Sequence, residues 1–509
     1  MSDASSQPPF ELPAAELKHS VRRSAVAMAA AQLVSQLISL VGQTILLRLL
    51  LPEDYGLVGM ILPLVMFLRI FATLGLNVAT VQRQVIHADE VSSLFWLNVL
   101  LSLATAGVAV VLAPYVGAFY AKPQAAVELR DLTWVLSGLS ILVALGAQHQ
   151  ALMERHMRLA RLGALRIAAQ FGGMTAAVVT ALAGWGLWAL VVQQYVELGL
   201  QSVLAWWAEP WRPRPPWRGA AIGGHLRLGG YFAAASIVFY VADNLDRVLV
   251  GRLVGPDAVG LYSQAYNVMI KPVYVVITPL VALVLTSLAR AANQRATRDE
   301  LIVAYYRLLA IVLLPASVGL VVTGGDVMQM LGGRAWSDAG PLLSVLAVGM
   351  FGQALVIVGV PILTAADEGR KLLAAAVLVA VALATAYMAG WATGNTRGEP
   401  VLGVACGYAI AILGLIAPLY TWFCASTADF SAREVFRSIL RPALAAFAMG
   451  ALVWLAGRSL PLETPVARLT VLVPLGALIY AAFAWPELRW LAAHGRQLLA
   501  AKIADPLTP

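Results

Sequence analysis

Seven charged side chains stand inside long apolar stretches of this sequence, where surrounding lipid would disfavour them. They are Arg69, Glu197, Asp243, Asp246, Arg247, Lys271 and Arg307. A charge at the centre of a bilayer costs about 2.5–3.5 kcal/mol on insertion scales, so such groups usually face a cavity, pair with one another or reach the interface. These side chains are therefore the first candidates for a polar site inside a membrane.

Three of the cations form a candidate binding site for an anion, namely Arg69, Arg247 and Lys271. Arg69 and Lys271 lie deep in two stretches that occupy equivalent places in an internal repeat. Guanidinium and ammonium groups both bind phosphate and carboxylate oxygens. Arg307 lies about six residues, or roughly 9 Å, inside the start of its stretch. We expect that side chain to reach the lipid headgroups instead.

The anions allow more than one interpretation. Asp243 and Arg247 are four residues apart on a predicted helix, so they form either a structural ion pair or part of a functional site. Asp246 is out of line with them and is expected to reach the outer interface. Desolvation would favour the protonated form of the Glu197 carboxyl. Glu197 and Asp243 are candidates for ion coupling, although Glu197 could equally make a neutral, hydrogen-bonded helix contact.

Polar side chains also recur at helical spacing on two of the apolar stretches. Matched with an offset of 204 residues, they are Gln32, Gln36, Ser39 and Gln43 in the first stretch and Ser236, Tyr240, Asp243 and Arg247 in the second. Such stripes either hydrogen-bond neighbouring helices or line a hydrated cavity. The charges in the second stripe favour a cavity.

Composition indicates the elements that must carry these residues. The chain has 509 residues, of which 60% are hydrophobic and 12% charged, and its mean hydropathy is +0.79. A soluble protein has about 25% charged residues, so a soluble enzyme and a disordered protein are excluded. Fourteen stretches approach the roughly 20 residues that a spanning helix requires. We predict an all-α, polytopic membrane protein with about 14 transmembrane helices.

The basic residues report the orientation of these helices. Numbered from a cytoplasmic N-terminus, the inner segments hold 23 Lys and Arg and the outer loops hold 8. An excess of basic residues marks the cytoplasmic side, so both termini are predicted to be cytoplasmic. The net charge of +8 therefore reflects topology, and no nucleic-acid partner is expected.

An internal repeat divides the chain. The segment Arg48–Val58 reads RLLLPEDYGLV, and Arg252–Tyr262 reads RLVGPDAVGLY. Six predicted helices separate the copies, so the two halves have the same orientation, as in transporters with parallel repeats. We predict two parallel six-helix lobes with two further C-terminal helices.

The predicted boundaries follow from this division and from the charged, Pro- and Gly-rich segments. They are a cytoplasmic N-terminal segment (1–23), an N-lobe (24–207), a cytoplasmic linker (208–229), a C-lobe (230–425), a final helix pair (426–486) and a cytoplasmic tail (487–509).

Motifs of catalysis are missing from the sequence. The two cysteines, Cys406 and Cys424, lie in apolar runs, and the six histidines lack metal-ligand spacing. The sequence contains no nucleotide-binding or hydrolase signature. We therefore expect no catalytic residues, no metal and no bound cofactor. The short predicted outer loops also argue against a membrane-bound polymerase or ligase.

Four segments carry a resemblance to a known family. They are RLLLPEDYGLVGM (Arg48–Met60), FATLGLNVATVQR (Phe71–Arg83), GWGLWALVVQQ (Gly184–Gln194) and DNLDRVLVGRLVGPDAVGLYSQAYNV (Asp243–Val268). In these segments the chain resembles the Wzx-type polysaccharide flippases of the MOP (multidrug/oligosaccharidyl-lipid/polysaccharide) superfamily, in the branch of colanic-acid-type exporters.

The resemblance implies two lobes around a central cavity in the bacterial inner membrane. It implies export of an undecaprenyl-diphosphate-linked oligosaccharide by alternating access, driven by a proton or sodium gradient. The surrounding lipid would hold the substrate's tail, and a polysaccharide polymerase or export machinery is a candidate partner. Two alternatives share the fold, a MATE-like multidrug or cation antiporter and a lipid II flippase. The deep cations argue against the antiporter, and the quoted motifs are closer to the polysaccharide branch.

Overall fold

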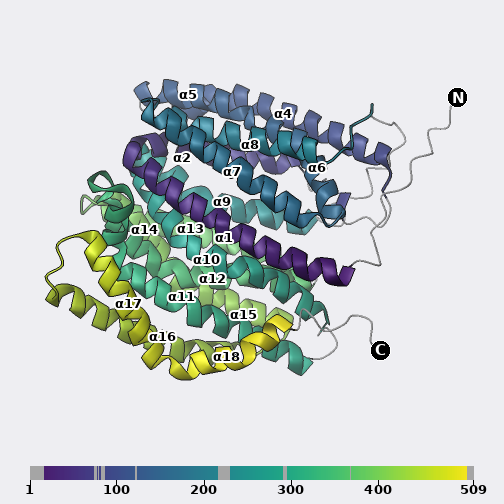
Figure 1. The fold of residues 1–509 in the computed structure, drawn as a ribbon. Helices are drawn as coiled ribbons and strands as arrows, with labels where there is room; N and C mark the ends of the chain where they lie inside the picture. Colours follow the sequence, from purple (N-terminus) through teal and green to yellow (C-terminus); the bar gives the residue numbers. More distant parts are fainter. Residues whose placement is uncertain are drawn as a thin grey trace. The chain divides into compact units, whose positions relative to one another are not determined.

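Helices account for nearly all of the architecture. The computed structural model describes residues 17–73, 77, 80–81, 86–120, 123–215, 230–290, 295–366 and 368–500, and over these ranges it contains no β-strand (Figure 1). A helix satisfies its backbone hydrogen bonds internally, and for this reason an apolar chain surrounded by lipid folds as helices. The predicted all-α class is confirmed.

By their contacts, the helices form two units, residues 1–229 with 255–260, and residues 230–254 with 261–509. The helices of the first unit are α1 (Leu17–Leu49), α2 (Pro52–Thr73), α4 (Ala88–Tyr120), α5 (Pro123–Ser137), α6 (Leu139–Arg155), α7 (Leu159–Leu182) and α8 (Trp188–Ala208). Of the predicted linker (208–229), residues 216–229 lie outside the described ranges.

The second unit begins with α9 (Gly230–Leu253) and includes most of α10 (Pro256–Arg290), whose first turn belongs to the first unit. It continues with α11 (Arg295–Gly332), the 3₁₀ turn η1 (Arg334–Trp336), α12 (Ala339–Ala365), α13 (Gly369–Asn395), α14 (Pro400–Ile410), the π-helical turn η2 (Ala411–Ile416), α15 (Ala417–Ala428), α16 (Ala432–Ser459), α17 (Pro465–Phe483) and α18 (Trp485–Ala500).

Ten helical segments within the described ranges are long and apolar enough to cross a membrane. Many of their large apolar side chains are exposed, including Leu100 and Val111 on α4, Leu378 on α13 and Leu478 on α17. Exposed apolar surface of this extent marks a face covered by another apolar phase. The polytopic membrane class is confirmed, while fourteen crossings remains a prediction.

The first unit is packed around a cluster of small and branched side chains from four helices. Leu46 and Leu50 at the end of α1 contact Met174 and Ala177 of α7, together with side chains from α2 and α8. Figure 1 shows α1 running beside α7. Because Ala177 is small, these helices approach closely, as in other membrane bundles.

The described start of the linker is held against the first unit. Trp96 Nε1 of α4 donates to the Arg214 carbonyl at 2.8 Å, and the Arg214 amide donates to Ser92 Oγ at 3.1 Å. His149 of α6 stacks on Trp206, and its Nε2 lies 3.2 Å from the Trp211 carbonyl oxygen. The segment is therefore held by hydrogen bonds to its backbone carbonyl and amide groups, and its prolines do not prevent these bonds.

In the second unit, the C-terminal helices pack on a long central helix. α11 contacts α12 and α16, α9 contacts α13, and α16 is paired with α17. The described part of the predicted cytoplasmic tail (487–509) is helical, since Trp485–Ala500 forms the helix α18. Its sequence has charged and aromatic residues at helical spacing, a pattern that favours an amphipathic helix. The remaining domain boundaries stay predictions.

Candidate functional site

The two copies of the repeat form the same local structure. α1 ends at Leu49 and α9 at Leu253, while α2 begins at Pro52 and α10 at Pro256. Both pairs of residues differ by the predicted offset of 204. Proline fits the first position of a helix because that position needs no N–H donor. Each proline thus starts a new helix after a short break.

The two copies also contact each other within the first unit. A Cβ built on Gly56 would overlap the backbone carbonyl of Pro256, and a Cβ built on Gly260 would overlap the carbonyl of Pro52. Each glycine faces the carbonyl of the other copy's proline, so the contact between the first turns of α2 and α10 is reciprocal and locally two-fold. Both glycines are buried, and only a residue without a side chain permits this approach.

One face of α9 carries the candidate site of the second unit. Arg247 Nη1 donates to Asn244 Oδ1 at 2.8 Å, and the guanidinium lies 5.2 Å from the centroid of the Tyr266 ring. Within the described part of the chain, Arg247 Nε has no hydrogen-bond partner, and no ion pair joins Arg247 to Asp243. The two charges still attract each other, and the choice between a structural and a functional role for them stays a prediction.

Asp246 lies in different surroundings from those expected. It is 1% exposed, and its Oδ1 accepts the Arg247 amide at 2.7 Å. Its Oδ2 lies beside the Tyr262 hydroxyl, and among the described residues neither atom has a hydrogen-bond partner of standard geometry. The expectation that Asp246 reaches the outer interface is wrong, because its carboxylate is buried beside Tyr262 of α10.

A group of polar side chains beside α9 was not anticipated from the sequence. Tyr408 donates to Gln353 Oε1 at 3.4 Å, and its ring lies 6.1 Å from that of Tyr266 and 6.5 Å from that of Tyr387. The Gln353 amide faces the Asp243 carboxylate. Tyr262 and Tyr266 are four residues apart on α10, and this spacing is the one signal that could have indicated them.

Asp243 is the exposed member of this group. Ser236 and Tyr240 precede it on α9; the Ser236 hydroxyl donates to the Phe232 carbonyl at 2.9 Å, and the Tyr240 carbonyl accepts from Asn244 at 2.9 Å. The face thus presents a carboxylate and a guanidinium with amide and hydroxyl groups around them. Such a set binds a polar or anionic solute through several hydrogen bonds.

The other two candidate cations lie on α2 and α10. Arg69 is half-buried four residues before the end of α2, and its Nη1 lies 3.1 Å from Met66 Sδ. Lys271 is half-buried in the interior of α10. Both lie within apolar helices, and their role in binding an anion remains a prediction.

The stripe of α1 has mixed surroundings. Gln32 is exposed, whereas Gln36, Ser39 and Gln43 are half-buried. The neighbouring Ser35 donates to Gln170 Oε1 of α7 at 2.5 Å, and Gln170 Nε2 donates back to the Ser35 carbonyl at 3.1 Å. Ser35, which lies next to the stripe on α1, therefore makes the interhelical hydrogen bonds to α7. The stripe itself stays a candidate cavity lining.

Glu197 is half-buried on α8, where α7 approaches it closely at Gly173. Among the residues that the structure describes, none forms a hydrogen bond or ion pair with its carboxyl. A helix contact stabilised by hydrogen bonding would require such a partner. Both interpretations of Glu197, ion coupling and a neutral helix contact, stay predictions.

Arg307 has partners on α18 that the sequence did not indicate. Its Nε donates to Glu487 Oε2 of α18 at 2.6 Å, and its guanidinium lies 4.2 Å from the Trp490 ring centroid. The expectation that this side chain reaches the level of the headgroups stays a prediction, and the structure adds a protein partner for it. The carboxylate that pairs with it stands 180 residues away in the sequence.

The arrangement defines the class of the protein as a polytopic, all-α membrane protein with the fold of MOP-superfamily transporters. Its fold is similar to that of the lipid II flippase MurJ in an inward closed conformation, with a TM-score of 0.73 and 13% identity over 92% of this chain and all of that one. It is also similar to an inward-facing MATE multidrug transporter of the MOP superfamily, with a TM-score of 0.60 and 14% identity, over 81% of this chain and 95% of the other.

Within that class, the chain belongs to the polysaccharide biosynthesis protein family, whose model matches residues 45–341. It is 28% identical to the lipopolysaccharide biosynthesis protein WzxC of Escherichia coli K12, over 61% of this chain and 63% of the relative. It is 26% identical to the teichuronic acid biosynthesis protein TuaB of Bacillus subtilis over 81% and 84%. It is 25% identical to the succinoglycan biosynthesis transport protein ExoT of Rhizobium meliloti over 86% and 87%.

Proposed function

We propose that this protein is an inner-membrane flippase for surface polysaccharide biosynthesis. Its substrate is an undecaprenyl-diphosphate-linked oligosaccharide destined for exopolysaccharide, lipopolysaccharide O-antigen or capsule. The observation that carries the proposal is the family match over residues 45–341 on a chain whose apolar helices hold a charged, tyrosine-rich site. Relatives named for lipopolysaccharide, teichuronic acid and succinoglycan biosynthesis support this substrate class.

The cations are assigned to the head of the substrate. A diphosphate is anionic, and Arg247 offers it a guanidinium whose Nε is unpartnered among the described residues. Arg69 and Lys271 add positive charge on two other helices. In surroundings of low dielectric constant these charges attract phosphate more strongly than in water. The apolar polyprenyl tail remains in lipid while the head is transferred by alternating access of the two lobes.

Ion coupling is assigned to Asp243 and Glu197, with a proton or sodium gradient as the energy source. Asp243 is the exposed residue beside the tyrosines of the second unit. Glu197 has no hydrogen-bond or ion-pair partner among the described residues. A carboxyl of this kind can take up and release a cation without disrupting packed neighbours. Both termini are assigned to the cytoplasm, and a polysaccharide polymerase or export machinery is the expected partner.

The test is genetic and biochemical together. Deleting the gene should abolish the surface polysaccharide while undecaprenyl-linked repeat units accumulate on the cytoplasmic leaflet. Complementation with Arg69→Ala or Lys271→Ala should restore the folded protein in the membrane but not normal export. Normal amounts of precursor on the outer leaflet of the deletion strain would contradict the proposal.

A lipid II flippase is the second candidate, because the similarity to MurJ covers the whole of that chain. The two functions separate in a strain depleted of its own lipid II flippase. If this protein is a polysaccharide flippase, its expression should not restore growth of that strain. Restored growth would favour lipid II as the substrate.

A further inference from the structure

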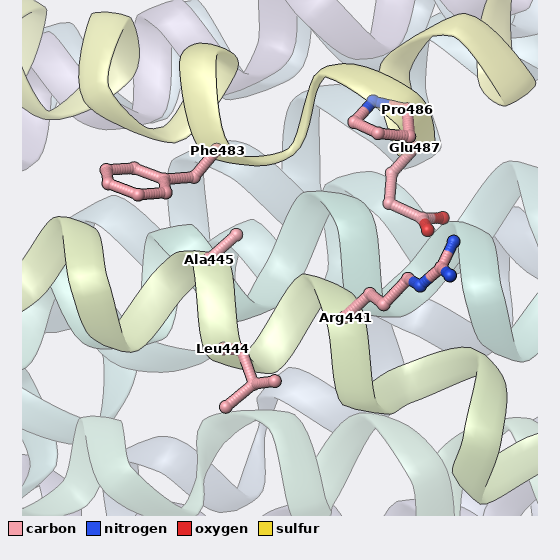
Figure 2. Close-up of a pocket in the computed structure, with 6 residues that line it drawn as sticks. All are labelled: Arg441, Leu444, Ala445, Phe483, Pro486 and Glu487. Carbon is pink, nitrogen blue, oxygen red and sulfur yellow. The ribbon is translucent and has the colours of Figure 1, made fainter.

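A pocket lies among the three C-terminal helices, outside the internal repeat (Figure 2). Its volume is about 420 Å³, and it is lined by Arg441, Leu444 and Ala445 of α16, Phe483 at the end of α17, and Pro486 and Glu487 at the start of α18. One wall is apolar and the other carries charged groups. The transport site proposed above uses none of these residues.

The pocket is lined by two charged residues, Arg441 and Glu487, and their surroundings differ. Glu487 is 4% exposed at its side chain and is already paired with Arg307 at 2.6 Å. Figure 2 shows the Arg441 side chain extending toward the same carboxylate. Across the described residues no hydrogen bond or ion pair is formed by Arg441, which is exposed. Because Arg307 already neutralises Glu487, Arg441 is the charged group of the pocket that has no partner among the described residues.

The apolar wall is open rather than packed. Leu444 is 61% exposed and Phe483 is 57% exposed, and both belong to helices long and apolar enough to span a membrane. Exposed side chains of this type contact acyl chains. The pocket therefore joins an apolar surface to a single cationic group.

The surrounding residues are those of a membrane interface. Trp485 is 53% exposed, and the Arg489 guanidinium lies 5.3 Å from its ring centroid. Tryptophan is enriched at the level of the headgroups, and an amphipathic helix such as α18 lies in that plane. Basic pockets between transmembrane helices on the cytoplasmic side bind acidic headgroups. The predicted topology places this end of α16 on that side.

We infer that this pocket binds an anionic phospholipid of the surrounding membrane. The phosphodiester contacts Arg441, and one acyl chain lies along Leu444 and Phe483. The single unpaired cation, Arg441, matches a phosphodiester, whereas a diphosphate carries more negative charge than one guanidinium compensates. The site is therefore assigned to bulk lipid and not to the transported substrate.

Native mass spectrometry of the full-length protein tests the inference directly. The purified protein is titrated with phosphatidylglycerol and, separately, with zwitterionic phosphatidylethanolamine. Arg441→Gln should weaken retention of phosphatidylglycerol about fivefold, the effect of one basic residue near an anionic lipid, and should leave phosphatidylethanolamine unchanged. Arg441→Lys keeps the charge and should retain most of the binding.

Arg433→Gln is the matched control, because Arg433 is exposed on the same helix and does not line the pocket. Equal losses in the Arg441 and Arg433 variants would show only general attraction between lipid and basic surface, and would overturn the inference. Displacement of one bound phosphatidylglycerol by one undecaprenyl diphosphate at this site would overturn it too. The assay measures binding without transport, so its outcome is independent of the proposed flippase activity.

Discussion

Asp243 and Asp246 show how two carboxylates three residues apart on one helix acquire different roles. Asp243 is exposed and faces Gln353, whereas Asp246 is buried against Tyr262 and accepts the Arg247 amide. An exposed carboxylate is available to a ligand or ion. A buried one stabilises the packing of its own helix.

This difference predicts separable effects of substitution. Asp243→Asn should reduce transport and change the free energy of unfolding by less than about 0.5 kcal/mol. Asp246→Asn should destabilise the protein by about 1–3 kcal/mol, because it perturbs a buried hydrogen-bonded group. Thermal unfolding in detergent, combined with a transport assay, measures both effects. Equal destabilisation by the two variants would contradict the distinct roles.

At this scale the sequence indicated charges but not their partners. Arg247 and Asp243 stood out because lipid excludes charge. Gln353 and Tyr408 did not, because each lies on another helix of the second unit and looks ordinary within its own apolar stretch. The partner of Arg307 was not predicted for the same reason, since Glu487 is distant in sequence.

At the scale of elements, the crossing of α2 and α10 depends on two glycines. Gly56 and Gly260 each face the backbone carbonyl of the other copy's proline, and a backbone group cannot rotate away as a side chain can. Gly56→Ala and Gly260→Ala should each destabilise the fold by about 1–3 kcal/mol, the usual cost of overpacking.

Gly199→Ala provides the control for this prediction. Gly199 lies within α8 and has open space where a Cβ would stand. Its replacement should leave stability unchanged or raise it by up to about 1 kcal/mol, because alanine is the better helix former. If all three variants unfold at the same temperature, the crossing is not under steric constraint.

Docking of α18 depends on the pair between Arg307 and Glu487. Glu487→Ala should lose a charge-assisted hydrogen bond worth about 1.5–3 kcal/mol and leave the start of α18 more open to proteolysis. Limited digestion with mass analysis of the C-terminal fragment measures this. Glu463→Ala is the control, since Glu463 is exposed in the segment between α16 and α17. Equal cleavage of both variants would contradict the role of the ion pair.

Helix positions were the most predictable elements. Pro52 and Pro256 start helices at the predicted offset, because proline at the first position is a local signal. No helix was predicted within the cytoplasmic tail, where α18 forms, because its charged residues interrupt the apolar pattern used to find spanning helices. The π-helical turn Ala411–Ile416 has no such signal, and it arises inside an otherwise regular apolar helix.

At the scale of the whole molecule, composition was sufficient to predict the class. A chain with 12% charged residues has too few to cover a soluble surface, and ten apolar helices of spanning length in the described ranges agree with this. The repeat predicted that α1 is equivalent to α9 and that α2 is equivalent to α10. The contact between the two copies required the structure, since the sequence shows equivalence but not proximity.

The distribution of basic residues predicts the topology of the entire chain. With 23 Lys and Arg on one predicted side and 8 on the other, both termini should be cytoplasmic. Green fluorescent protein fused to either terminus should therefore fluoresce. Alkaline phosphatase fused to either terminus should be inactive. Active phosphatase at one terminus only would require an odd number of crossings.

The central claim is that this protein moves a lipid-linked oligosaccharide across a membrane, and reconstitution tests it most directly. The purified protein is placed in vesicles that carry an undecaprenyl-diphosphate-linked oligosaccharide, and a membrane-impermeant glycosidase reports the fraction exposed outside. With an ion gradient imposed, the wild-type protein should bring the oligosaccharide of the inner leaflet to the outside faster than the Lys271→Ala variant does. It should also do so faster than occurs in vesicles without protein. Equal rates in all three, with the wild-type protein folded, would contradict the proposed function.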